Sequence, residues 1–252
     1  MQSQSTAHGV PSWVTLASPD VPAAASFYRA LLGWQTIGNE TYLLASRDGV
    51  PVGALLPAAS GTSGWLPYLG VPSVTEAIDD VVRAGGSSLT SPEADGTGAM
   101  VAIVTDQAGV RFALRESPAA PSLNQKIAPG TLAWGELIAD DVDASAAFYA
   151  KVFGWEFTDA VGSLGRREWQ VHGERVAGLL PRPPAMPAEI PPYWDVYFAV
   201  DDIAAASKTA ADHGGTRLMP PTPVEIGTIA VFLDPAGAIF TLVQLTTEEA
   251  AA

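Results

Sequence analysis

Two acidic residues stand close to tryptophan in apolar segments of the chain. Glu136 lies two positions after Trp134, and Asp195 directly follows Trp194. A carboxylate that is buried without a partner holds its proton more tightly, so it can act as a general base near neutral pH. Two structural explanations stay open, because each carboxylate could lie at a solvated strand end or pair with an arginine. The residue types therefore predict acid–base chemistry at Glu136 and Asp195. A solvated position or an arginine partner stays open as the alternative for each.

Histidine and cysteine give little support for a metal or a covalent mechanism. The chain has no cysteine, which excludes a disulfide framework, a zinc–thiolate site and a thiol nucleophile. Its three histidines are His8, His172 and His213, and they form neither an HxH nor an HExxH pattern. We expect His8 in a tail, His172 in a strand and His213 at the end of a helix, where a cation meets the helix dipole favourably. These residues predict no metal site and no cofactor.

The composition indicates a folded and strongly acidic protein. Hydrophobic residues make up 48% of the 252 residues and charged residues 16%, so the chain can bury a sizeable core. Acidic residues outnumber basic ones 27 to 13, and the net charge of −14 repels nucleic-acid phosphates and anionic membranes. The first twenty residues lack a signal-peptide pattern, and no apolar run is long enough to cross a bilayer. We expect a cytoplasmic protein without nucleic-acid or membrane partners. Whether the protein forms a homodimer is left open by the sequence.

An internal repeat divides the chain into two copies. Residues 13–34 and 134–155 align without gaps, 121 positions apart, with 10 identities in 22 positions. Later matches, such as Tyr68 with Tyr197, continue the repeat. Each copy is long enough for a domain, and the Pro- and Ser-rich segment between them suits a linker. We predict domain 1 at residues 8–116, a linker at residues 117–130 and domain 2 at residues 131–246.

Both copies predict the same order of strands and helices. In the first copy, a short strand at residues 13–17 leads to Asp20, a natural helix N-cap, and the following helix ends at Gly33. A second helix is expected over residues 74–84. Further strands are expected at residues 42–45, 52–56, 68–71, 100–105 and 111–115. The fold class is therefore α+β, a tandem duplication with four βαβββ modules.

Each copy also carries an ordered set of short motifs. Trp-x-x-Leu comes first, followed by a helix-capping Asp, a Phe-Tyr pair inside the helix, Gly-Trp after it, and a later Asp-x-Ala-Gly turn. This order resembles the vicinal oxygen chelate superfamily of glyoxalases, bleomycin-resistance proteins and extradiol dioxygenases, and most of all its two-domain actinobacterial glyoxalase-like members. The resemblance implies that each half curves into a half-open barrel with a pocket inside. It does not fix the function, because the superfamily holds isomerases, dioxygenases, thiol transferases and drug-sequestering proteins.

The resemblance also implies metal-ligand positions, and this chain departs from them. Members with metal chemistry usually place His, Gln or Glu seven residues before the helix-capping residue, and Glu in the last strand of a module. These positions hold Trp13, Leu66, Trp134, Asp195, Ala113 and Thr241 here. Among these six, Asp195 alone could bind a metal, and one carboxylate cannot hold a catalytic divalent ion. The departures predict a metal-independent member of the superfamily.

The same positions predict an aromatic pocket. If the family's ligand positions face the cavity, strand alternation sends every second residue to that face. Ligand-binding residues are then Trp13, Thr15, Tyr68, Trp134, Tyr197 and Thr241, with Glu136 and Asp195 as the catalytic candidates. Such a pocket suits a flat or hydrophobic organic molecule held by stacking. The alternative is that these aromatic residues only fill the core.

Three functions follow as hypotheses. The first is a natural-product-binding or self-resistance protein that holds a hydrophobic or aromatic small molecule without reaction. The second is an acid–base enzyme of secondary metabolism, with lyase, isomerase or hydroxylase-like chemistry through Glu136 or Asp195. The alternative is a metal-dependent glyoxalase, lyase or dioxygenase, against which the missing ligands argue.

Overall fold

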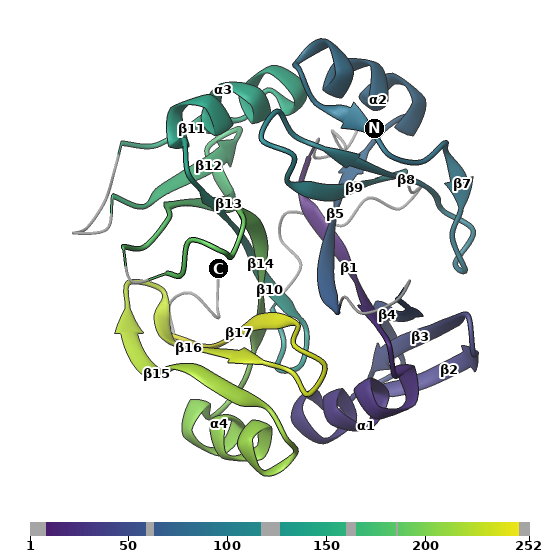
Figure 1. The fold of residues 1–252 in the computed structure, drawn as a ribbon, viewed down its shortest axis with the longest axis vertical. Coiled ribbons are helices and arrows are strands. Elements are labelled where there is room, and N and C mark those ends of the chain that lie inside the picture. The colour runs from purple at the N-terminus through teal and green to yellow at the C-terminus, as the bar shows by residue number, and fades with distance from the viewer. Residues whose placement is uncertain (1–8, 59–62, 117–126, 160–164, 185, 247–252) are drawn as a thin grey trace, which may run out of the picture. The chain divides into compact units, whose positions relative to one another are not determined.

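A computed structural model of the chain describes residues 9–58, 63–116, 127–159, 165–184 and 186–246. In these residues a strand, a helix and further strands follow one another four times, twice in each half (Figure 1). The helices are α1 (Val21–Leu32), α2 (Val74–Arg83), α3 (Val142–Phe153) and α4 (Ile203–Asp212). This order confirms the predicted α+β class and the tandem duplication of βαβββ modules. Within the described ranges, no helix has the length and apolar character needed to cross a membrane.

The strands of each half form one sheet. The first sheet has the order β2-β3-β4-β1-β5-β9-β8-β6, with β7 paired to β8, and the second has the order β11-β12-β13-β10-β14-β17-β16-β15. Strands β1 and β10 therefore hold equivalent places, as do β5 and β14. The strands of the first half are β1 (Pro11–Ser18), β2 (Gln35–Asn39), β3 (Tyr42–Arg47), β4 (Val50–Pro57), β5 (Gly64–Val71), β6 (Ser87–Ser88), β7 (Glu93–Ala94), β8 (Met100–Thr105) and β9 (Arg111–Glu116). Those of the second half are β10 (Leu132–Ala139), β11 (Glu156–Phe157), β12 (Arg167–Val171), β13 (Glu174–Pro181), β14 (Tyr193–Ala199), β15 (Thr216–Val224), β16 (Gly227–Leu233) and β17 (Ile239–Leu245).

The first helix of each half begins and ends as the repeat predicts. The carboxylates of Asp20 and Asp141 each accept a hydrogen bond of 2.9 Å from the backbone N–H three residues further on. Gly33 and Gly154 end these helices in the left-handed conformation, with φ of 71° and 70°. A side chain is strained in this conformation, so glycine at both positions sets where the helix stops.

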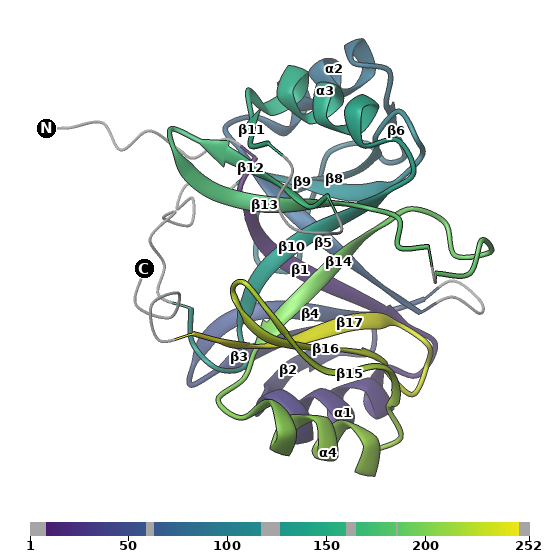
Figure 2. The ribbon, with the colours of Figure 1, turned by 90° about the vertical axis from the view of Figure 1, so that its left-hand side faces the viewer.

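The chain divides into two compact units, and each unit draws on both halves of the sequence. Unit 1 consists of Met1–Ser12, Pro67–Gln125 and Trp134–Trp194, and unit 2 of Trp13–Leu66, Lys126–Ala133 and Asp195–Ala252. Helices α2 and α3 pack side by side in unit 1, and α1 and α4 do so in unit 2 (Figures 1 and 2). Each compact unit therefore combines one module of each copy. The boundaries of domains 1 and 2, which follow the repeat along the sequence, stay a prediction.

In each unit the strands turn one face toward a buried hydrophobic core. Leu137 and Ala139 of β10 belong to the core of unit 1, so Glu136, which alternates with them, lies on the opposite face of the sheet. Val14 and Leu16 of β1 belong to the core of unit 2 in the same way. The face away from the core is therefore the one that carries the candidate site residues.

A tyrosine hydroxyl joins the two halves of the chain inside unit 2. Tyr28 of α1 donates a hydrogen bond of 3.2 Å to the carboxylate of Asp234, and it accepts one of 3.2 Å from the indole of Trp65. Tyr28 belongs to the Phe-Tyr motif of the first half, whereas Asp234 opens the last turn of the second half. The buried hydroxyl of Tyr28 thus has both a donor and an acceptor as partners.

Unit 1 repeats this arrangement with the halves exchanged. Tyr149 of α3 accepts a hydrogen bond of 2.8 Å from the indole of Trp194 and lies near the carboxylate of Asp106, in the turn of the first half. Burial raises the pKa of Tyr28 and of Tyr149 well above the ordinary value, and the neighbouring carboxylates raise it further. Both phenols therefore stay protonated and can donate to their aspartates.

Three features of the fold differ from the sequence-based expectations or go beyond them. β2 is fully exposed at the edge of its sheet, so it carries no apolar alternation that the sequence could reveal. β15 is also an edge strand and contains three prolines, which are tolerated there because an edge leaves some N–H groups unpaired. His172 was expected in a strand but lies in the exposed turn between β12 and β13, with φ of 54°. His213 caps α4 as predicted, and His8 lies outside the described residues.

We predict that Tyr28→Phe and Tyr149→Phe each lower the free energy of unfolding by about 1–3 kcal/mol, because each removes the hydroxyl that accepts a hydrogen bond from a tryptophan indole. Urea unfolding measures the change. Ser26→Ala, which removes an exposed hydroxyl from α1, is the control and should change stability by less than about 0.5 kcal/mol. Tyrosine variants as stable as this control would contradict the role of the hydroxyls.

Candidate binding site at Trp134 and Glu136

Trp134 and Glu136 lie on β10, on the face away from the core of unit 1. Glu136 is the register partner of Gly178 in the neighbouring parallel strand β13. A β-carbon at Gly178 would come too close to both the carboxylate of Glu136 and the indole nitrogen of Trp134. Gly178 therefore leaves the space in which these two side chains lie against β13.

One guanidinium group serves two carboxylates beside Trp134. The Nε of Arg166 donates to the Oε1 of Glu136 at 2.6 Å, and its Nη1 donates to the Oε1 of Glu168 at 2.9 Å. The side chain of Glu136 is 4% exposed, that of Glu168 15% and that of Arg166 21%. Arg175 approaches Glu168 more distantly, at 3.7 Å, and is 34% exposed. Short, charge-assisted bonds of this kind hold both carboxylates in fixed positions.

The same arginine lies over the indole ring of Trp134. Its Cζ is 5.8 Å from the ring centroid, within the range of a cation–π contact. The indole nitrogen of Trp134 is buried and donates to none of the described residues. This arrangement places an aromatic surface next to fixed charged groups, which is how protein sites hold and orient flat organic molecules.

The other predicted residues of the second half belong to unit 2. Asp195 of β14 is 4% exposed and accepts a hydrogen bond of 2.7 Å from the hydroxyl of Thr241. Thr241 is in turn the register partner of Tyr197. The structure thus brings Asp195, Tyr197 and Thr241 together within one unit, whereas Glu136 and Trp134 belong to the other.

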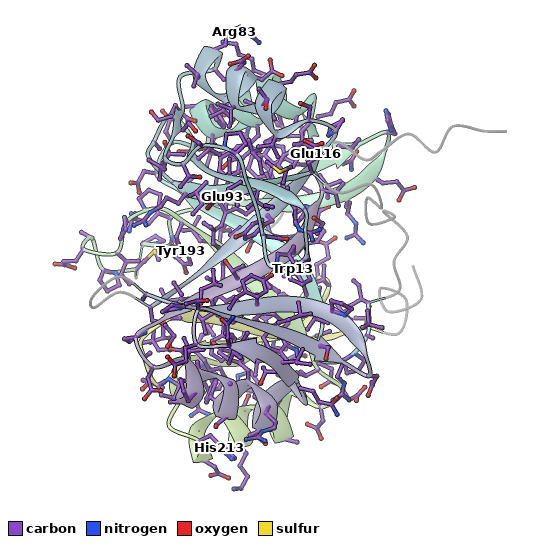
Figure 3. The ribbon with its side chains drawn as sticks, turned by 90° about the vertical axis from the view of Figure 1, so that its right-hand side faces the viewer. Trp13, Arg83, Glu93, Glu116, Tyr193 and His213 are labelled. Carbon is purple, nitrogen blue, oxygen red and sulfur yellow. The ribbon has the colours of Figure 1, made fainter. Side chains whose placement is uncertain are left out.

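The predicted residues of the first half are buried as well. Trp13 and Thr15 lie on β1 in unit 2 and are 6% and 4% exposed (Figure 3). Tyr68 lies on β5 in unit 1, opposite Ala113, just as Tyr197 lies opposite Thr241. The equivalence of the two tyrosines, inferred from the repeat, therefore holds in the strand register.

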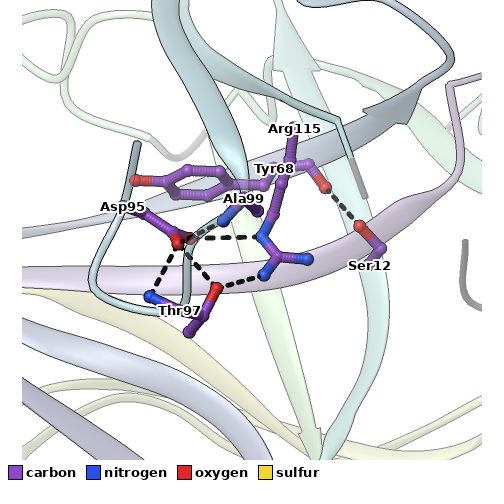
Figure 4. Close-up of polar contacts among 6 residues, drawn as sticks. All are labelled: Ser12, Tyr68, Asp95, Thr97, Ala99 and Arg115. Atoms are coloured by element: carbon purple, nitrogen blue, oxygen red, sulfur yellow. Dashed lines mark hydrogen bonds and ion pairs between the residues drawn. The ribbon is translucent and has the colours of Figure 1, made fainter. Parts of the chain in front are cut away.

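A second buried ion pair of unit 1 has a structural role. Arg115 of β9 donates to Asp95 at 3.3 Å and to the hydroxyl of Thr97 at 2.7 Å (Figure 4). The other carboxylate oxygen of Asp95 accepts from the Thr97 hydroxyl and from the N–H groups of Thr97 and Ala99. One acid thus balances one base, and the contacts tie down the turn between β7 and β8 beside Tyr68 (Figure 4).

The donor groups in the described ranges do not fit a metal ion. No group of three or more His, Asp or Glu side chains that could hold a metal occurs within those ranges. At the family's ligand positions, Asp195 supplies a carboxylate that is bonded to Thr241, and Ala113 and Leu66 supply no donor atom. We assign no metal-dependent reaction to these residues. That the purified protein contains no stoichiometric metal is a prediction, which elemental analysis would test.

Sequence reasoning did not find Arg166, Glu168 or Arg175. They lie 30 or more positions after Glu136, and only the pairing of β12 with β13 brings them to it. One signal was present, because the polar residues Glu168 and Gln170 alternate with the core residues Trp169 and Val171. Polar residues at every second position indicate a face turned away from the core, but not the partner that they meet there.

Comparisons with known proteins agree with this fold. The family model described as the glyoxalase/bleomycin resistance protein/dioxygenase superfamily matches residues 11–114 and 131–242. The chain is 32% identical to a putative glyoxylase, CFP32, of Mycobacterium tuberculosis, covering 94% of this chain and 95% of the relative. It is 32% identical to the anthracycline biosynthesis protein DnrV of Streptomyces peucetius, covering 95% and 94%. A Mn(II)-bound glyoxalase from Novosphingobium aromaticivorans has a similar fold, with a TM-score of 0.70 at 18% identity, covering 94% of this chain and 83% of its own.

We predict that Arg166→Met lowers the free energy of unfolding by about 3 kcal/mol, because it leaves two largely buried carboxylates without their shared partner. Arg167→Met is a matched control at the next position. Arg167 pairs with Asp143, whose side chain is 84% exposed, so its loss should cost less than about 1 kcal/mol. Chemical denaturation of both variants measures the difference, and equal losses would show that the network is as weak as a surface ion pair.

Proposed function

Since the chain belongs to the glyoxalase/bleomycin resistance protein/dioxygenase superfamily, we propose that it binds a hydrophobic, planar aromatic small molecule against Trp134 without a metal. The protein would serve as a natural-product-binding or self-resistance protein. The ring of the ligand would stack on the indole of Trp134, and the Glu136–Arg166–Glu168 network would orient the polar groups of the ligand.

The observation that carries this proposal is the charged network at a position where the duplicated module has none. Glu136 and Glu168 both lie opposite Gly178, whereas Thr15 and Leu44 lie opposite the equivalent Ala54. The first module thus forms the same strand pairs without charges at these two positions. Charges on a buried sheet face are costly, so a role other than folding explains them best.

The relatives support the chemical class of the ligand. DnrV and DauV carry the name of anthracycline biosynthesis proteins, and both match this chain over about its whole length. Anthracycline biosynthesis handles fused, flat ring systems, which match an indole surface by shape and by stacking. We therefore place the ligand among polycyclic aromatic natural products.

An acid–base enzyme of secondary metabolism is the second candidate. Asp195 supports it, because this buried carboxylate accepts the hydroxyl hydrogen of Thr241 and could take up a proton from a bound molecule. Glu136 supports it less, because its Oε1 already accepts a hydrogen bond of 2.6 Å from the Nε of Arg166. A metal-dependent glyoxalase, lyase or dioxygenase remains the alternative that the donor groups fit least.

Glu136→Gln tests whether Glu136 orients the ligand or acts as a general base, because it keeps the shape of the side chain and removes its charge. If Glu136 orients the ligand, we expect the affinity for the compound that co-purifies with the native protein to fall about tenfold. If Glu136 is a general base, affinity should stay and turnover should fall about 100-fold or more. Titration calorimetry and a product assay by mass spectrometry give both readouts.

A neutral probe, anthracenemethanol, tests the proposed function itself. We expect saturable binding, and Trp134→Ala should weaken it by about 2 kcal/mol, on the scale of an aromatic residue at the centre of an interface. Phe157→Ala removes an exposed ring in the same unit and should leave the affinity unchanged. A native protein that does not bind the probe, or two variants that bind it equally well, would refute a site at Trp134.

A further inference from the structure

We propose that β2 of unit 2 is a contact surface between two copies of this chain, which pair edge to edge and antiparallel about a two-fold axis at Ile37. The inference does not depend on the proposed function, because β2 carries none of the predicted site residues. An edge strand turns a row of backbone N–H and C=O groups away from its sheet, and a strand of a second copy can supply their partners.

β2 differs from the other sheet edges in the described part of the chain. The strands β6, β7 and β11 are two residues long, and β15 contains three prolines, which have no N–H to donate. Short strands and prolines are devices that keep sheet edges from pairing with other molecules. β2 has five residues, none of them proline, and lies outermost in its sheet (Figure 1). It is therefore the edge best suited to take up a strand of a second copy.

The centre of β2 carries the most exposed large hydrophobic side chain of the described residues. Ile37 is the third of the five residues and is 72% exposed. Its register partner in β3 is Leu44, which is partly exposed, so the two side chains lie side by side on one face of the sheet. A two-fold axis at Ile37 extends this pair into a row of four apolar side chains, two from each copy. The surface is thus complementary to itself, as a two-fold interface requires.

The charges at this edge permit two copies to approach each other. The net charge of the chain is −14, so a contact between copies needs a surface that avoids like charges, and β2 holds no charged residue. In the antiparallel register, Glu40 at the end of one β2 comes opposite the start of the other. At that start the guanidinium of Arg47 lies against Gly33 and donates to the carbonyl of Leu32, and Asp48 pairs with it from an exposed turn. The antiparallel arrangement therefore brings an acidic residue near a basic one at both ends of the strand pair.

The length of β2 sets the expected strength of the contact. A stable interface buries about 1,200–2,000 Å² in total, and two five-residue strands bury less, so we expect a weak dimer with a dissociation constant of about 100 µM. Analytical ultracentrifugation of the full chain between about 10 µM and 1 mM should show monomer at the low end and mostly dimer at the high end.

Ile37→Lys tests the edge, because a charged side chain at the centre of an edge strand opposes pairing. We expect this variant to stay monomeric over the whole concentration range, although it lowers the net negative charge of the chain. Leu218→Lys is the matched control. It places the same charge at a 50% exposed side chain of β15, the edge with prolines, and should dimerise as the native protein does. A thermal melt of each variant confirms that it is folded.

A disulfide crosslink tests the position of the two-fold axis. The chain has no cysteine, so a single introduced cysteine can pair only with its copy in a second molecule. Residues that lie opposite each other in an antiparallel pair are close enough for a disulfide. At equal protein concentration under mild oxidation, Ile37→Cys should form the linked dimer about tenfold faster than Leu218→Cys, because pairing raises the effective concentration of the thiols.

The outcomes decide the proposal. It stands if the native protein dimerises, Ile37→Lys alone stays monomeric and Ile37→Cys crosslinks faster than its control. A native protein that is still monomeric at about 1 mM would refute it. A dimer that persists in Ile37→Lys, or that Leu218→Lys abolishes equally, would show that β2 is not the contact surface. Equal rates of crosslinking for the two cysteine variants would contradict an axis at Ile37.

Discussion

A tyrosine hydroxyl held between an indole and a carboxylate is the interaction on which each compact unit depends. Tyr28 meets Asp234 and Trp65 in unit 2, and Tyr149 meets Asp106 and Trp194 in unit 1. In both units the helix comes from one half of the chain and the aspartate from the other. Polar groups of this kind are costly to bury alone, and these contacts bring together modules from different copies. The duplication in the sequence therefore does not produce two separate cores, one for each copy. It produces two cores that are each shared between the copies, and this follows from a contact that the linear repeat does not show.

The shared cores explain why one face of each sheet is free to change. Helices cover the face that carries Val14, Leu16, Leu137 and Ala139, and all four belong to the buried cores. The opposite face is not needed to bury the helices, so its residues can differ between equivalent modules. Thr15 and Leu44 stand in one module where Glu136 and Glu168 stand in the other. Duplication thus supplied a second copy of a stable module, and one face of that copy carries charged groups that the fold does not require.

The sequence was sufficient for the elements that depend on local signals. Asp20, Gly33, Asp141 and Gly154 act through their own backbone geometry, so the helix ends could be predicted, and the repeat gave the four modules. It was insufficient wherever a contact joins distant strands. Arg166 reaches Glu136 because β12 lies beside β13 in a particular register, and no spacing along the chain reveals that. β15 was hidden by its prolines, which an edge strand tolerates. The aromatic positions Trp13, Tyr68, Trp134 and Tyr197 could be placed on the right strands, but whether they bind a molecule or fill space depends on their neighbours in three dimensions.

The arginine beside Glu136 also bears on what kind of chemistry this face can support. The Oε1 of Glu136 accepts a hydrogen bond of 2.6 Å from the Nε of Arg166. A carboxylate held in this way has a fixed position, which suits it to orient a polar group of a bound molecule. Asp195 belongs to the other unit, where it accepts a hydrogen bond of 2.7 Å from the hydroxyl of Thr241. Binding at Trp134 and acid–base chemistry at Asp195 are therefore two separate hypotheses, carried by different residues of different units, and variants of one carboxylate do not test the other.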